Sequence, residues 1–170
     1  MTPGRYILSR DTFSVGGDYT VVDHTGATVL TFDGKLRFAA TFAVLAPDGR
    51  ELFTGREHVF SLDRRFEFER DGVPYATVLR EMTSDPGQIL GTASYRYVAT
   101  LGTGDRIETA GYVLTRWTIA RGEETRARIE SDGYVHTIDL VDGADGTFVM
   151  AVVMAVARLN PPSGLDARAD

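Results

Sequence analysis

Apolar and polar residues alternate with a period of two along most of the chain, from Tyr6 to Val141. The segment Arg65–Glu69 is the clearest example, because its phenylalanines fall on one face and its charged residues on the other. Alternation of this kind is typical of strands with one face on a core and the other in water. Similar segments at 95–101 and 125–130 extend the pattern, which predicts about twelve antiparallel strands in all.

Short turn-forming sequences separate these segments roughly every ten residues. Each supplies residues, chiefly glycine and aspartate, that tolerate a positive φ. They are Asp23–Gly26, Pro47–Arg50, Arg70–Gly72, Gly102–Asp105, Arg121–Glu123 and Ser131–Gly133. Strands and turns at this spacing are typical of an antiparallel sheet or barrel.

One segment breaks the period-two pattern, because no side chain in residues 148–157 carries a charge or makes a strong hydrogen bond. Asp142 and Asp145 before it are helix N-cap types, and Pro161 after it is a stop signal. The valines also allow a buried strand, but the length and the alanines favour a helix at about 145–159. Ten helical residues span only about 15 Å, half the hydrocarbon thickness of a bilayer, so we expect no transmembrane segment.

A helix that is apolar all round must be enclosed by other elements. The amphipathic strands offer one apolar face, and closing them into a barrel around the helix also removes exposed sheet edges. We therefore predict a mainly β fold, a closed twelve-stranded antiparallel barrel enclosing a hydrophobic C-terminal helix. Residues 1–160 are expected to form this single domain, and residues 161–170 a flexible tail.

Composition narrows the classes of function. The chain has 170 residues, a net charge of -6 and no cysteine. A negative net charge disfavours non-specific nucleic-acid binding, and the lack of cysteine removes disulfides, thiolate metal ligands and cysteine nucleophiles. The N-terminal sequence has no hydrophobic signal core, so we expect a cytoplasmic protein.

Several short segments of the sequence, in the same order, resemble the LURP-one-related family of bacteria and plants. They are Thr12–Val15, Val21–Gly26, Phe66–Gly72, Tyr75–Val78 and the final segment 142–158. The resemblance covers nearly the whole chain, and it places the protein with Tubby C-terminal domains and phospholipid scramblases. It implies the same barrel around a hydrophobic helix that the residue pattern predicts.

The resemblance also implies a non-enzymatic intracellular binding module, with an anionic phospholipid or phosphoinositide head group as the candidate partner. Tubby-type recognition uses basic residues two apart on a strand, which places two cations on one face. The candidate anion-binding residues are Lys35 and Arg37, Arg126 and Arg128, and the adjacent pair Arg64 and Arg65. The alternative is that these are solvated strand faces, neutralised by nearby glutamates such as Glu67 and Glu130.

Other candidate chemistry is weaker. The histidines lie far apart in sequence, at His24, His58 and His136, and we expect no metal site or cofactor. Asp139 stands three residues after His136, a spacing that puts the two side chains on opposite faces of a strand, so a hydrolase dyad is not expected. No nucleophile elbow is present, and we expect no catalytic residues. Trp117 is expected to pack on the barrel.

Two alternatives to head-group binding remain at this stage. In the first, the apolar run at 148–157 inserts into a membrane, as in a scramblase-like protein, although its short length disfavours insertion. In the second, the barrel binds a protein partner and no lipid. For the preferred hypothesis we expect a location in the cytoplasm, with peripheral association at the inner face of the plasma membrane.

Overall fold

The computed structural model describes residues 1–11, 17–35, 41–58, 64–83, 94–101, 106–112 and 115–159; the side chains of residues 35, 82, 83, 94, 95, 107 and 110–112 are not described. In these ranges the chain forms strands and one helix. They are β1 (Gly4–Arg10), β2 (Tyr19–Asp23), β3 (Thr28–Lys35), β4 (Thr41–Leu45), β5 (Glu51–His58), β6 (Arg65–Arg70), β7 (Val73–Thr83), β8 (Ser94–Leu101), β9 (Arg106–Tyr112), β10 (Arg116–Arg121), β11 (Glu124–Asp132), β12 (Val135–Leu140) and α1 (Gly146–Leu159).

The strands form a closed barrel in which sequence neighbours pair with one another, and β1 also pairs with β12. The closing pair is antiparallel, with Tyr6 opposite Ile138 and Leu8 opposite His136. Closure pairs the backbone groups that a first and a last strand would otherwise leave exposed. The predicted fold, a mainly β twelve-stranded antiparallel barrel with a C-terminal helix, is confirmed.

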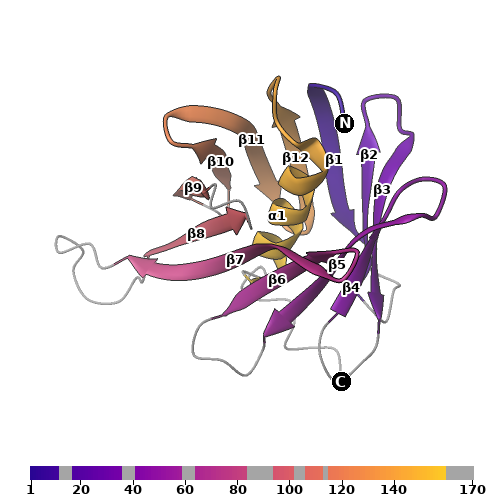
Figure 1. Cartoon of the computed structure of the whole chain (residues 1–170). Coiled ribbons are helices and arrows are strands. Elements are labelled where there is room, and N and C mark those ends of the chain that lie inside the picture. The colour runs from indigo at the N-terminus through magenta and orange to yellow at the C-terminus, as the bar shows by residue number, and fades with distance from the viewer. Residues whose placement is uncertain are drawn as a thin grey trace, which may run out of the picture.

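Helix α1 lies inside the barrel (Figure 1), where it runs from the end at which β1 begins to the end at which β1 finishes. Its residues from Phe148 to Val156 are all buried. Burying a large apolar side chain contributes about 1.5–3 kcal/mol, so enclosure of the helix is a main source of stability. Among the described residues, no helix is long and apolar enough to span a membrane.

Asp145 begins the helix, as its position before the apolar run predicts. The backbone N–H of Phe148 donates to Asp145 Oδ1 at 3.1 Å, and that of Val149 donates to the Asp145 carbonyl at 2.9 Å. These bonds satisfy donors that the first helical turn would otherwise leave unpaired.

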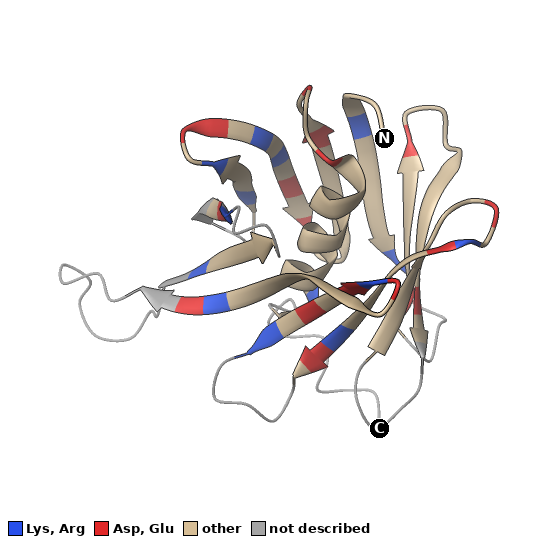
Figure 2. Cartoon of the chain, in the orientation of Figure 1, with Lys and Arg blue, Asp and Glu red and all other residues tan. Residues whose placement is uncertain are grey.

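The barrel wall follows the alternation seen in the sequence. In β6, Phe66 and Phe68 are buried, while Glu67 between them is half-exposed. Charged side chains accordingly lie on the strands and turns, whereas α1 carries none before its last turn (Figure 2). Any charged site must therefore be built on the outer wall or at the two ends of the barrel.

Candidate anion-binding surface

The predicted site residue Lys35 ends β3, and its backbone lies in a lateral row that crosses several strands. Lys35 pairs with Thr41 of β4, Thr41 pairs with Arg56 of β5, and Arg56 pairs with Glu67 of β6. Adjacent strands are about 4.8 Å apart, so two strand spacings separate the backbones of Lys35 and Arg56. The side chain of Lys35 and the whole of Arg37 lie outside the described residues.

Arg56 is a basic residue that the sequence reasoning missed. Its side chain is exposed, and it makes no ion pair with any described residue. No second lysine or arginine lies two positions from Arg56 in β5, so a search for lysine or arginine pairs at this spacing does not find it. Only the pairing of β5 with β4 and β6 places Arg56 beside the predicted residues.

Arg65 lies on the outer face of β6, opposite His58 and diagonal to Arg56, which itself lies opposite Glu67. Its Nη2 is 3.0 Å from Glu67 Oε1, while Nε2 of His58 is 2.8 Å from Glu67 Oε2. One carboxylate is thus shared by a guanidinium and an imidazole. The Nε atom of Arg65 is buried and has no hydrogen-bond partner among the described residues.

Arg64 immediately precedes β6. Its carbonyl accepts a hydrogen bond of 3.1 Å from the backbone N–H of Arg80, which extends the β6–β7 pairing by one step. Its guanidinium makes no ion pair with the described part of the chain. Alternation along this pairing puts the Arg64 side chain on the face opposite to Arg65, so we refer to Arg56 and Arg65 alone as the β5–β6 basic cluster.

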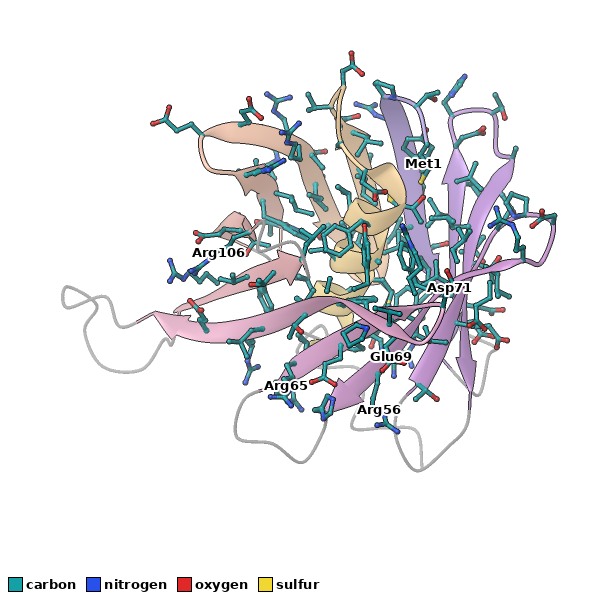
Figure 3. All side chains as sticks on the ribbon, in the orientation of Figure 1. Met1, Arg56, Arg65, Glu69, Asp71 and Arg106 are labelled. Atoms are coloured by element: carbon teal, nitrogen blue, oxygen red, sulfur yellow. The ribbon has the colours of Figure 1, made fainter. Side chains whose placement is uncertain are left out.

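A hollow of about 300 Å³ lies on the wall beside this cluster. It is lined by Thr41, Phe42, Thr54, Gly55, Arg56, Glu67 and Glu69. Figure 3 shows Arg56, Arg65 and Glu69 near one another over β5 and β6. The hollow offers a guanidinium and threonine hydroxyls to a polar ligand, and its carboxylates limit how much negative charge it can accept.

Arg126 and Arg128 share the outer face of β11, as predicted, but both lie next to acceptors. Arg126 bonds to Glu124 and donates to the Gly143 carbonyl at 3.3 Å. Arg128 pairs in register with Asp139 of β12. Four strands, β10, β9, β8 and β7, separate β11 from β6, so these residues form no common site with the β5–β6 basic cluster.

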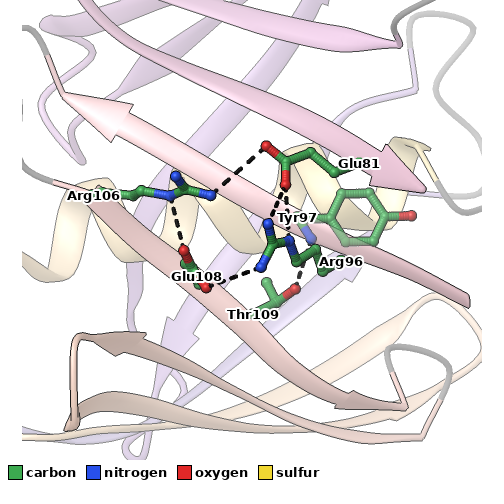
Figure 4. Close-up of polar contacts among 6 residues, drawn as sticks. All are labelled: Glu81, Arg96, Tyr97, Arg106, Glu108 and Thr109. Carbon is green, nitrogen blue, oxygen red and sulfur yellow. Dashed lines mark hydrogen bonds and ion pairs between the residues drawn. The ribbon is translucent and has the colours of Figure 1, made fainter. Parts of the chain in front are cut away.

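A ring of four charged residues joins β7, β8 and β9 (Figure 4). Arg96 lies 2.7 Å from Glu81 and 3.7 Å from Glu108, while Arg106 lies 3.7 Å from Glu81 and 2.8 Å from Glu108. The ring carries no net charge, because each guanidinium meets both carboxylates. It cross-links the wall and offers no unneutralised charge to a ligand.

His136 points into the barrel and is only 6% exposed. Its Nδ1 lies 2.9 Å from Ser131 Oγ, which also accepts a hydrogen bond of 3.1 Å from Trp117 Nε1. Burial lowers the pKa of His136 to about 4, so the ring is neutral at pH 7. Trp117 itself is buried, as predicted.

Asp139 lies on the opposite, outer face of β12 and pairs with Arg5, so it does not orient His136 as a hydrolase dyad would require. The hydrogen bond from Arg5 lowers the pKa of Asp139 below its usual value. Within the described ranges, no three histidine or carboxylate side chains converge as a metal site would require.

Comparison with known proteins gives a family match and matches to solved structures. The family model for LURP-one-related proteins matches residues 5–157. The X-ray structure of an Arabidopsis thaliana protein superposes with a TM-score of 0.65 at 15% sequence identity, covering 94% of this chain and 93% of that one. At this low identity, the superposition shows a shared fold. The chain matches none of the curated proteins.

Proposed function

Because the chain belongs to the LURP-one-related family, we propose that it is a non-enzymatic binding module that recognises an anionic phospholipid or phosphoinositide head group. The β5–β6 basic cluster makes the main contacts in this proposal. Lys35 and Arg37, whose side chains lie outside the described residues, are further candidates for this contact. Fold similarity alone does not assign a ligand, so the proposal depends on the charges of this wall.

The observation that carries the proposal is the state of Arg56. It is an exposed guanidinium without an ion pair in the described chain, in the same lateral row as Lys35 and diagonal to Arg65. The carboxylate opposite it, Glu67, is already bound by Arg65 and His58. Guanidinium groups bind phosphate through paired, charge-assisted hydrogen bonds, which makes a free arginine more informative than a neutralised one.

The position of α1 favours peripheral binding over insertion. Its apolar side chains are packed inside the barrel, so inserting them into a bilayer would first require the barrel to open. The proposed location is therefore the cytoplasm and the inner face of the plasma membrane, with the head group bound at the protein surface. This argument disfavours the scramblase-like alternative.

Vesicle co-sedimentation tests the proposal. Neutral phosphatidylcholine vesicles are compared with vesicles that also contain phosphatidylglycerol or phosphoinositide, at low and physiological salt. Each basic residue near an anionic surface contributes about 1 kcal/mol, so an Arg56→Ala/Arg65→Ala variant should bind roughly 30-fold more weakly. The control, Arg50→Ala/Arg116→Ala, removes the same charge from the β4–β5 turn and from β10.

Salt-sensitive binding to the anionic vesicles, lost in the first variant and kept in the control, supports the proposal. Equal binding by both variants would assign any membrane affinity to another surface. Absence of binding to every vesicle would favour the second candidate function, a protein-interaction module, and would move the search to protein partners.

A further inference from the structure

The barrel end at which α1 finishes carries inward-facing polar side chains that the head-group proposal does not use. Arg10 and Tyr19 form a cross-strand pair at the ends of β1 and β2. Arg158 lies in the last turn of α1. Glu57 lies at the end of β5, and its carboxylate is 3.5 Å from Arg158 Nε. These four residues come from four different elements.

Two of the guanidinium groups lie near Gly17. A Cβ atom built on this glycine would lie 3.5 Å from Nη1 of Arg158 and 3.7 Å from Nη2 of Arg10. Both groups therefore border one small space. Gly17 has φ 70°, a conformation that side-chain-bearing residues rarely adopt, so the backbone here favours the residue that leaves this space open.

The ion pairs of the described residues leave one of these two guanidinium groups without a carboxylate. Arg158 pairs with Glu57, and their side chains are only 22% and 12% exposed. Arg10 stacks on the ring of Tyr134, with its Cζ 5.0 Å from the ring centre, and makes no ion pair with a described residue. Solvent screens charge less in such half-buried surroundings than on an open surface.

Tyr19 adds a neutral donor. The residue is 3% exposed, and its hydroxyl has no hydrogen-bond partner among the described residues. Burial raises the pKa of Tyr19, and the guanidinium groups of Arg158 and Arg10 act in the opposite direction. The hydroxyl thus lies within electrostatic reach of both arginines and keeps its proton at neutral pH.

We propose that this barrel end is a seat for a phosphate group, bound between Arg10 and Arg158 with the Tyr19 hydroxyl as a third donor. Two guanidinium groups that approach from different elements suit a tetrahedral dianion better than a planar monoanionic carboxylate. The helix C-terminus opposes an anion here through its partial negative charge, and the side chain of Arg158 offsets it. We call Arg10, Gly17, Tyr19 and Arg158 the mouth seat.

The mouth seat shares no residue with the β5–β6 basic cluster. The phosphate group can belong to a free phosphate or to the head group of a lipid, because the seat recognises the shared chemistry. Binding at this position adds a function to the proposed head-group recognition and does not depend on it.

Thermal unfolding in increasing inorganic phosphate, against sodium chloride of matched ionic strength, tests the seat. We expect saturable stabilisation of the wild-type protein by phosphate only, because a ligand that binds the native state raises its melting temperature. Arg10→Gln, which breaks no described ion pair, should weaken phosphate binding at least tenfold. Arg50→Gln, which removes an exposed charge from the β4–β5 turn and also breaks no described ion pair, is the matched control and should not.

A second arm uses vesicles that contain phosphatidic acid. Binding lost in Arg10→Gln but kept in Arg56→Ala/Arg65→Ala would identify the mouth seat as the site of a lipid phosphate. Phosphate stabilisation lost in Arg10→Gln without any vesicle effect would identify a soluble phosphate ligand. If neither probe distinguishes Arg10→Gln from wild type, the mouth seat is wrong. The proposed function is judged separately, by the Arg56→Ala/Arg65→Ala variant.

Discussion

The ring of Phe42 lies against the backbone of Gly55, its partner across the β4–β5 pair. A Cβ atom on Gly55 would lie 2.1 Å from the Cζ atom of that ring, a separation that real side chains do not reach. Phe42 also contacts Phe32, Phe66 and Phe68, with ring centres 5.7–6.1 Å apart. The glycine therefore sets the position of an aromatic cluster that packs inside the barrel.

Replacement of Gly55 by alanine should destabilise the protein by about 1–3 kcal/mol, because the added methyl group displaces a packed ring. The free energy of unfolding in urea measures this. Thr54→Ala, at the adjacent outward position, serves as the control and should change stability by less than about 0.5 kcal/mol. A Gly55→Ala protein as stable as wild type would show that Phe42 has room to move.

Acid should destabilise the barrel through His136. Burial holds the pKa of His136 at about 4, against 6.5 for an ordinary histidine. Between these pH values the unfolded chain binds a proton that the folded chain does not, so stability falls as pH drops from about 6.5 towards 4. The loss should approach roughly 3 kcal/mol, since one pKa unit corresponds to about 1.4 kcal/mol.

Urea unfolding at pH 7, 5.5 and 4.5 checks this pH dependence. His136→Leu should remove most of the change between pH 7 and 4.5, whereas His24→Gln, in the exposed β2–β3 turn, should keep it. An unchanged pH profile in His136→Leu would assign the acid sensitivity to other groups.

Ser131 Oγ bridges Trp117 Nε1 and His136 Nδ1 inside the barrel wall. Ser131→Ala should leave these two nitrogen atoms without their present hydrogen-bond partner. Removing one member of a buried hydrogen-bond pair destabilises by about 1–3 kcal/mol. Trp117 is the single tryptophan of the chain, so its fluorescence reports on this site directly. An altered emission spectrum in Ser131→Ala, and an unaltered one in the exposed-site variant Arg116→Ala, is the expected result.

Loss of the helix cap should destabilise the protein. Asp145 accepts the N–H of Phe148 at 3.1 Å with one carboxylate oxygen and the hydroxyl of Tyr75 at 3.1 Å with the other. Asp145→Ala should lower stability by about 1–2 kcal/mol, whereas Asp145→Asn, which keeps an acceptor, should lower it less. Equal stability of the two variants in thermal unfolding would mean that the cap contributes little once α1 is enclosed.

Arg126 and Arg128 should be dispensable for anionic vesicle binding. Arg126 is tied to Glu124 and to a backbone carbonyl, and Arg128 lies opposite Asp139. An Arg126→Ala/Arg128→Ala variant should therefore co-sediment like wild type, whereas Arg56→Ala/Arg65→Ala should not. The reverse result would move the head-group site to β11.

The sequence alone predicted much of the fold. Alternation with period two predicted the strands, the apolar run at 148–157 predicted the enclosed helix, and Asp145 was predicted as a cap type. These features are local, because a residue's face within a strand or helix depends only on its position along that element. The resemblance to the family pointed to the same barrel.

The charged sites depended on the tertiary structure. Arg56 lies opposite Glu67 because β5 and β6 pair in one register, and Arg10 approaches Arg158 because β1 and α1 finish at the same end of the barrel. A shift of one residue in register would turn every side chain of a strand to the other face. Spacing along the chain identified pairs such as Arg126 and Arg128, which share a face as predicted, but the carboxylates that neutralise them come from pairing and turn geometry. The sequence by itself thus determined which residues face the core and which face water, while strand register and barrel closure decided which charges meet.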